Sequence, residues 1–125
     1  MTDREAKHKQ AIKLMELGAF SESASQFYTL IADASDARFQ SAYGIFLQKL
    51  GRWTESIQQF EAALALKHAY CEADWRNMLA LSYLLYGQEG RAIAQWRIVV
   101  DMEPSYPSRD VPIDESKRML WKYAP

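Results

Sequence analysis

Cysteine is almost absent from this sequence, because Cys71 is the only one among 125 residues. A single cysteine excludes an internal disulfide, a zinc site built from several cysteines and a paired-cysteine redox motif. This cysteine usage is typical of a reducing compartment, so we expect a cytoplasmic protein.

Long apolar runs are missing as well. The nearest candidate, residues 78–86, has nine residues, whereas a membrane-spanning helix needs about 20. The first ten residues are mostly charged and polar and lack the apolar core of a secretory signal. The sequence therefore predicts neither a membrane span nor a secretory signal.

Neither sign of charge is in excess, since 15 basic residues face 16 acidic ones and the net charge is −1. Dedicated nucleic-acid binders carry a strong basic excess, so nucleic acid is not an expected partner. Apolar residues nevertheless make up 49% of the chain and aromatic residues 13%. That content is enough for a folded core and excludes wholesale disorder.

Residues that support catalysis are scarce. The two histidines, His8 and His68, lie far apart in the sequence, and neither has a partner at the spacing of a metal site. No glycine-rich phosphate loop and no nucleophile-elbow motif is present. Cys71 has acidic neighbours, which disfavour a thiolate. The sequence predicts no enzyme activity, no metal and no cofactor.

An internal repeat is the main feature that the sequence does contain. Three segments align: LGAFSESASQFYTLI from Leu17, LGRWTESIQQFEAAL from Leu50 and YGQEGRAIAQWRIVV from Tyr86. Their glycines, Gly18, Gly51 and Gly87, are 33 and 36 positions apart. Four more columns keep these spacings: Ala11, Gly44 and Ala80; Ser23, Ser56 and Ala92; Phe27, Phe60 and Trp96; and Leu30, Ala63 and Val99. Periods of this length indicate stacked supersecondary units.

Each repeat is expected to form two helices around its glycine. Apolar residues recur three and four positions apart on both sides of Gly51, which is the helical period. The glycine ends the first helix in a left-handed conformation. The small columns would meet where the two helices cross, and the aromatic column would fill the wedge beside the crossing. We predict helices at about 4–17, 21–33, 37–50, 54–67, 71–86 and 89–102.

A different pattern follows the third repeat. Three prolines between Pro104 and Pro112 predict a linker rich in turns. A last helix is expected to start after Asp114, a suitable N-cap, and to run to about Tyr123. Leu120 and Trp121 would cover the third repeat, because stacked repeats need a terminal cap. A docking tail for a partner is the alternative.

The repeat resembles the tetratricopeptide repeat (TPR), a helix–turn–helix unit of about 34 residues that stacks into a right-handed superhelix. The resemblance covers residues 4–104, although the large aromatic expected early in each repeat is replaced by Lys7, Gln40 and Arg76. It implies one all-α TPR domain over 1–125. The repeats would span about 4–36, 37–72 and 73–106, followed by a linker and capping helix over 107–125. TPR domains bind other proteins, so we expect a non-catalytic interaction module.

The resemblance also places the first helix of each repeat on a concave face. Residues at i, i+4 and i+7 share one side of a helix, which gives three stripes: His8, Ile12 and Met15; Ser41, Ile45 and Gln48; and Asn77, Leu81 and Leu84. The apolar members would anchor a peptide or helix of a partner. Ser41, Gln48, Asn77 and the neighbouring Lys49 would hydrogen-bond its backbone or set the polarity of the groove.

Several kinds of partner stay open at this stage. The TPR domains that bind heat-shock proteins use basic residues on these stripes, but the matching positions hold His8, Ile12, Ala42, Asn77 and Leu81, which argues against that type. The short array with an apolar groove is similar to chaperones of type III secretion translocators, and we keep this as an alternative to an adaptor. In a third reading the chain assembles with itself as a homodimer, and its own tail or a second copy covers the groove.

Overall fold

The computed structural model describes residues 2–33, 36–67, 71–102 and 110–125. Within these ranges the chain forms seven α-helices and no strand. They are α1 (Asp3–Glu16), α2 (Phe20–Asp33), α3 (Ala37–Lys49), α4 (Trp53–Ala65), α5 (Glu72–Leu85), α6 (Glu89–Val100) and α7 (Asp110–Tyr123). The first six lie within two residues of the predicted bounds, and the all-α fold is confirmed. None of the helices in the described ranges is long and apolar enough to cross a membrane.

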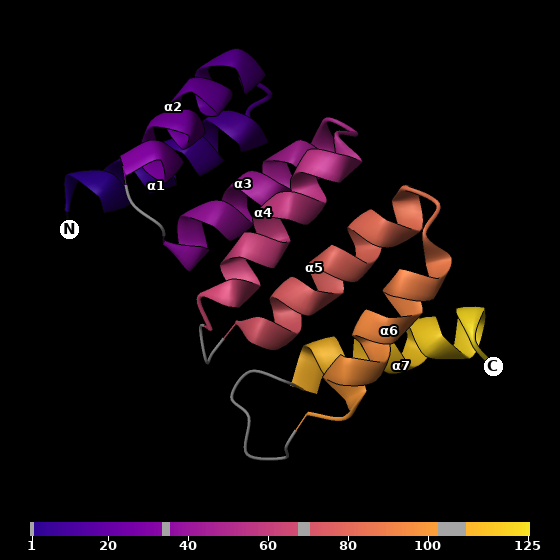
Figure 1. Ribbon diagram of the computed structural model, residues 1–125. Helices are drawn as coiled ribbons and strands as arrows, with labels where there is room; N and C mark the ends of the chain where they lie inside the picture. Colours follow the sequence, from indigo (N-terminus) through magenta and orange to yellow (C-terminus); the bar gives the residue numbers. More distant parts are fainter. Residues whose placement is uncertain (1, 34–35, 68–70, 103–109) are drawn as a thin grey trace.

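The helices form three antiparallel hairpins that stack in chain order, from α1–α2 through α3–α4 to α5–α6 (Figure 1). The two helices of each hairpin pack on each other, and α1 contacts α3 as α3 contacts α5. The final helix, α7, packs against both α5 and α6. This is an all-α helical repeat array of three hairpins, closed by a terminal helix.

The turns inside the hairpins depend on glycine. Gly18, Gly51 and Gly87 have φ angles of +83°, +73° and +86°, a conformation that a Cβ atom disfavours. The second helix of each hairpin begins two residues later, at Phe20, Trp53 or Glu89. The prediction that these glycines end the first helices is confirmed.

The small columns allow close contact inside the hairpins. In the first repeat they meet, because the Ser23 hydroxyl donates a hydrogen bond of 2.8 Å to the carbonyl oxygen of Ala11. In the second repeat Gly44 lies against the ring of Phe60, and a Cβ atom at this glycine would come within 2.9 Å of the ring. The aromatic column therefore packs directly on a position that has no side chain.

Two main apolar clusters form the core. The first cluster joins the first and second repeats through Ala11, Met15, Phe27, Ala42, Tyr43, Phe46 and Leu47. The second cluster joins α4, α5 and α6 through Phe60, Leu79, Ala80, Tyr83, Ala92 and Trp96. Partly buried Ile45 packs against both clusters and so links them across α3.

The last helix differs from its prediction. It begins at Asp110, so Asp114 is not its N-cap and Pro112 belongs to the helix instead of the linker. Proline fits there because the N–H groups of a first helical turn have no acceptor within the helix. Residues 103–109, which hold the rest of the predicted linker and Pro104, lie outside the described residues.

The cap is also oriented differently. Met119, Leu120 and Tyr123 pack against the second cluster, whereas Trp121 is 80% exposed. The prediction that Trp121 covers the third repeat is wrong. Because Leu120 faces the core, the next residue of a helix points about 100° away from it.

Candidate functional site

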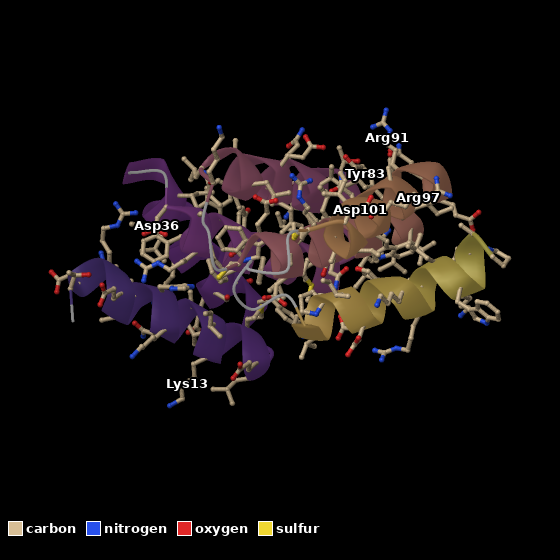
Figure 2. The ribbon with its side chains drawn as sticks, turned by 90° about the horizontal axis from the view of Figure 1, so that it is seen from below. Lys13, Asp36, Tyr83, Arg91, Arg97 and Asp101 are labelled. Carbon is tan, nitrogen blue, oxygen red and sulfur yellow. The ribbon has the colours of Figure 1, made fainter. Side chains whose placement is uncertain are left out.

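The predicted concave face is formed by α1, α3 and α5, with α7 at the end of the array. Seen from below, α1 (indigo) and α7 (yellow) lie along the same side of the molecule at its two ends (Figure 2). The three predicted stripes have different surroundings on this side.

The first stripe is largely built into the core. Met15 is buried in the first cluster and Ile12 packs against its edge. His8 lies edge-on to Phe39, with ring centroids 4.8 Å apart. Burial lowers the pKa of His8, and the nearby Arg38 lowers it further. This end of the predicted groove therefore offers an uncharged, half-buried imidazole and little free apolar surface.

The second stripe contains a hydrogen-bonded clamp. The Gln48 side-chain Nε2 donates to the carbonyl oxygen of Met78 and to the hydroxyl of Ser82, both at 2.7 Å. The Ser82 hydroxyl also lies 2.6 Å from that of Ser56. These contacts join α3, α4 and α5. The amide nitrogen of Gln48 is thus already hydrogen-bonded inside the chain.

The other members of the second stripe are divided between interior and surface. Ser41 is buried, and its hydroxyl donates to the carbonyl oxygen of Arg38 at 3.0 Å, within α3. Ile45 is partly buried between the two clusters. Lys49 is exposed. Among the polar residues predicted here, Lys49 is exposed, Gln48 is partly buried and Ser41 is buried.

The third stripe fastens α7. The Asn77 side-chain Nδ2 donates to the carbonyl oxygen of Pro112 at 3.0 Å, and its Oδ1 accepts a hydrogen bond from Ser116. Leu84 is partly buried against the second cluster, whereas Leu81 is 37% exposed. The stripe therefore supplies both the attachment of α7 and an accessible leucine beside it.

A pocket opens at this seam between α5, α6 and α7. It encloses about 270 Å³ and is lined by Asn77, Met78, Leu81, Trp96, Glu115, Arg118 and Met119. Four of these side chains are apolar, and the charged pair Glu115 and Arg118 comes from α7. We call this the α5–α7 pocket.

Sequence reasoning found two of the seven lining residues, Asn77 and Leu81. Trp96 belongs to the aromatic column that the sequence places in the wedge between helices, and Met78 receives no role from the sequence. The residues of α7 are predicted to cap the array, with a docking tail as the alternative. The i, i+4 spacing of Glu115 and Met119 on one helix face was the available signal. It could not be used because it required knowing where α7 docks.

The described residues offer no alternative centre for metal chemistry. Nowhere among them do three histidine, cysteine, aspartate or glutamate side chains come together to hold a metal ion. Burial, aided by Asp74, raises the pKa of the half-buried Cys71 thiol, so the thiol stays protonated at neutral pH. His68 lies outside the described residues.

Comparison with known proteins points to a fold. No protein-family model matches the chain, and no curated protein matches it. Its structure is similar to the crystal structure of the Yersinia enterocolitica type III secretion translocator chaperone SycD, described as an alternative dimer. The TM-score is 0.83 at 18% sequence identity, and the match covers 98% of this chain and 93% of that one. The two proteins share one fold. This all-α helical repeat extends over nearly the whole of both chains.

Proposed function

We propose that this protein is a non-catalytic chaperone or adaptor that holds a segment of a partner protein on the side formed by its first helices. The α5–α7 pocket would be the anchor point. The observation that carries the proposal is the accessible Leu81 beside Met78, Met119 and Trp96, in a pocket bounded by α5, α6 and α7. The likeness to a secretion translocator chaperone supports a chaperone more than an adaptor of another kind.

The size of the pocket favours one apolar side chain as its occupant. At about 270 Å³ it lies just below the range of about 300–1,000 Å³ that is typical of sites for small molecules. Burying a leucine-sized side chain there would contribute roughly 1.5–3 kcal/mol before the cost of ordering the bound segment. One such anchor gives weak binding, so we expect further contacts along the array.

Those further contacts are best sought at the exposed members of the predicted set. Lys49 and the accessible part of Leu84 lie on the helices next to the pocket, and Glu115 and Arg118 provide opposite charges at its rim. A bound backbone would have to displace existing hydrogen bonds at Gln48, Asn77 and Ser41. We therefore propose these three as supports of the site, while Ile12, Met15 and Ile45 shape it from the core.

The experiment that tests the proposal is peptide selection followed by titration. Peptides chosen from a random display library against the wild-type protein are labelled, and their affinity is measured by fluorescence anisotropy. Leu81→Glu places a charge in the pocket, and we expect it to weaken binding at least about tenfold, as for a central anchor. Leu66→Glu, at an exposed leucine beyond the end of α4, is the matched control and should bind as wild type.

Two outcomes would count against the proposal. Equal affinity of wild type and Leu81→Glu would move the site away from the α5–α7 pocket, provided that circular dichroism shows both to be folded. Failure to select any peptide would argue against a peptide-binding function.

The lone, protonated cysteine supports a reducing, cytoplasmic setting for this function.

A further inference from the structure

The outward face of α7 carries an unusual set of exposed side chains. Val111 is 68% exposed and Trp121 is 80% exposed, and the charged Asp114 and Arg118 lie exposed between them. The spacing of three, four and three residues places all four on one side of the helix. The opposite side holds the buried Pro112 and Ser116 and packs on the rest of the molecule. We call this stripe the α7 outer stripe. In the part of the chain that the structure describes, its two apolar side chains are left largely uncovered.

Two copies of the α7 outer stripe that run in opposite directions are complementary to each other. The stripe reads apolar, acidic, basic, apolar from Val111 to Trp121. If a second copy of the helix lies antiparallel on this face, Val111 meets Trp121 of the other copy and Asp114 meets Arg118. Each contact then occurs twice around a two-fold axis level with residue 116. An interface of this self-complementary kind is what a symmetric pair of identical chains requires.

We propose that a second copy of this chain docks antiparallel on the α7 outer stripe. The two tryptophan–valine contacts would supply most of the attraction, because exposed tryptophans are the side chains that gain most at interfaces. The two ion pairs would fix the antiparallel direction, because the parallel arrangement places like charges together. One helix per copy buries little surface, so the association belongs to the weak, transient class.

The charge pattern favours a second copy over a membrane surface. Lys117, Arg118 and Lys122 on the C-terminal half of α7 would be attracted to anionic lipid. Asp114 and Glu115 on the N-terminal half would be repelled by it. A partner with the same mixture, running in the opposite direction, satisfies both halves. This inference does not depend on the proposed function, although Arg118 also lines the α5–α7 pocket.

Sedimentation equilibrium of the full chain over a wide concentration range is the first test. We expect wild type to self-associate and Trp121→Ala to weaken the association constant at least about tenfold. The control is Leu17→Ala, which removes another exposed apolar side chain, 72% accessible, from the α1–α2 turn. It should associate like wild type, and circular dichroism should show all three proteins to be equally folded. A wild type that stays monomeric throughout, or equal effects of the two substitutions, would overturn the proposal.

Charge complementation is the second test, and a merely structural role cannot reproduce it. Asp114→Lys alone and Arg118→Asp alone each place like charges together in a pair of identical copies, so both variants should be monomeric. An equimolar mixture of the two should associate again, because each substituted side chain then faces an opposite charge. A mixture that stays monomeric contradicts the antiparallel pairing. Wild type that co-sediments with phosphatidylserine vesicles while remaining monomeric would assign the stripe to a membrane and overturn the proposal.

Discussion

The two junctions between repeats are held together in different ways. At the first junction the rings of Phe27, Tyr43 and Phe46 pack against one another, with centroids 5.6–5.9 Å apart. At the second junction apolar packing is joined by the amide of Gln48, which bridges from α3 to Ser82 and to the Met78 carbonyl oxygen on α5. Aromatic packing stabilises the first junction, whereas the second junction adds hydrogen bonds from Gln48, which we call the Gln48 clamp.

The difference shows how the α5–α7 pocket is positioned. Apolar burial has no preferred direction, so it stabilises a junction without fixing its register closely. Hydrogen bonds depend on distance and angle, so they do fix it. The pocket lies on α5, which Gln48 ties to the second repeat, and on α7, which Asn77 ties to α5. Polar bonds thus occur where the candidate site needs a fixed geometry.

The largest expected effect would come from breaking the aromatic junction. Phe46→Ala removes a fully buried ring from the first cluster and should lower the free energy of unfolding by about 3–5 kcal/mol in urea titrations. Phe46→Leu keeps part of the apolar volume and should cost clearly less, because packing there is not directional. A loss as large for leucine as for alanine would contradict this description of the junction.

A smaller effect is expected at the clamp. Gln48→Leu has a similar volume but leaves the Met78 carbonyl and the Ser82 hydroxyl without this donor, so unfolding should become easier by about 1–3 kcal/mol. Gln58→Leu, at an exposed position of α4, serves as the control and should change stability by no more than about 0.5 kcal/mol. If both variants match wild type, the clamp does not stabilise the second junction.

The smallest effect concerns pH and belongs to the first junction. Burial lowers the pKa of His8 below its ordinary value near 6.5, so the unfolded chain binds this proton more readily than the folded one. The contribution of neutral His8 to the free energy of unfolding should therefore be fully present above about pH 6.5. It should decline as the pH falls below that value towards the pKa of His8 in the folded chain. Thermal melting at stepwise lower pH should show this decline in wild type and not in His8→Leu.

A second titrating residue, Asp36, affects stability at still lower pH. Arg38 beside Asp36 lowers the pKa of this carboxyl, chiefly through their hydrogen bonds, so Asp36 contributes stability that is lost only below its ordinary value near 3.8. The loss from Asp36 begins near pH 3.8, well below the pH near 6.5 at which the loss from His8 begins. An unchanged decline between about pH 6.5 and 5 in His8→Leu would mean that another group causes it.

Much of the fold could be predicted because its determinants are local. The three turn glycines and the aromatic column identify the hairpins, and the left-handed φ angles at Gly18, Gly51 and Gly87 confirm the reason. The sequence mispredicts the start of α7 because the prolines indicate a turn-rich linker through Pro112, although the first turn of a helix accepts proline. The direction of Trp121 depended on the docking of α7, which no local pattern reveals.

The candidate site was less accessible to sequence reasoning because its contacts are long-range. The stripe pattern found Leu81 and Asn77, but the hydrogen bonds of Asn77 lead to residues 35 and 39 positions away. Gln48 finds its partners 30 and 34 positions away. A face can be assigned from the period of one helix, whereas the partner of a polar group on that face depends on how the helices stack.

Cys71 offers a way to follow local opening of the repeat array by chemical labelling. The thiol packs at the edge of a cluster formed by Ala37, Ala63 and Trp75, where three helices meet, and its raised pKa lowers the fraction of reactive thiolate. Partial burial and the raised pKa both slow alkylation of this thiol, so a change that opens this part of the array should raise the rate of labelling. Because the chain has no second cysteine, the labelling rate would report on the surroundings of Cys71 alone.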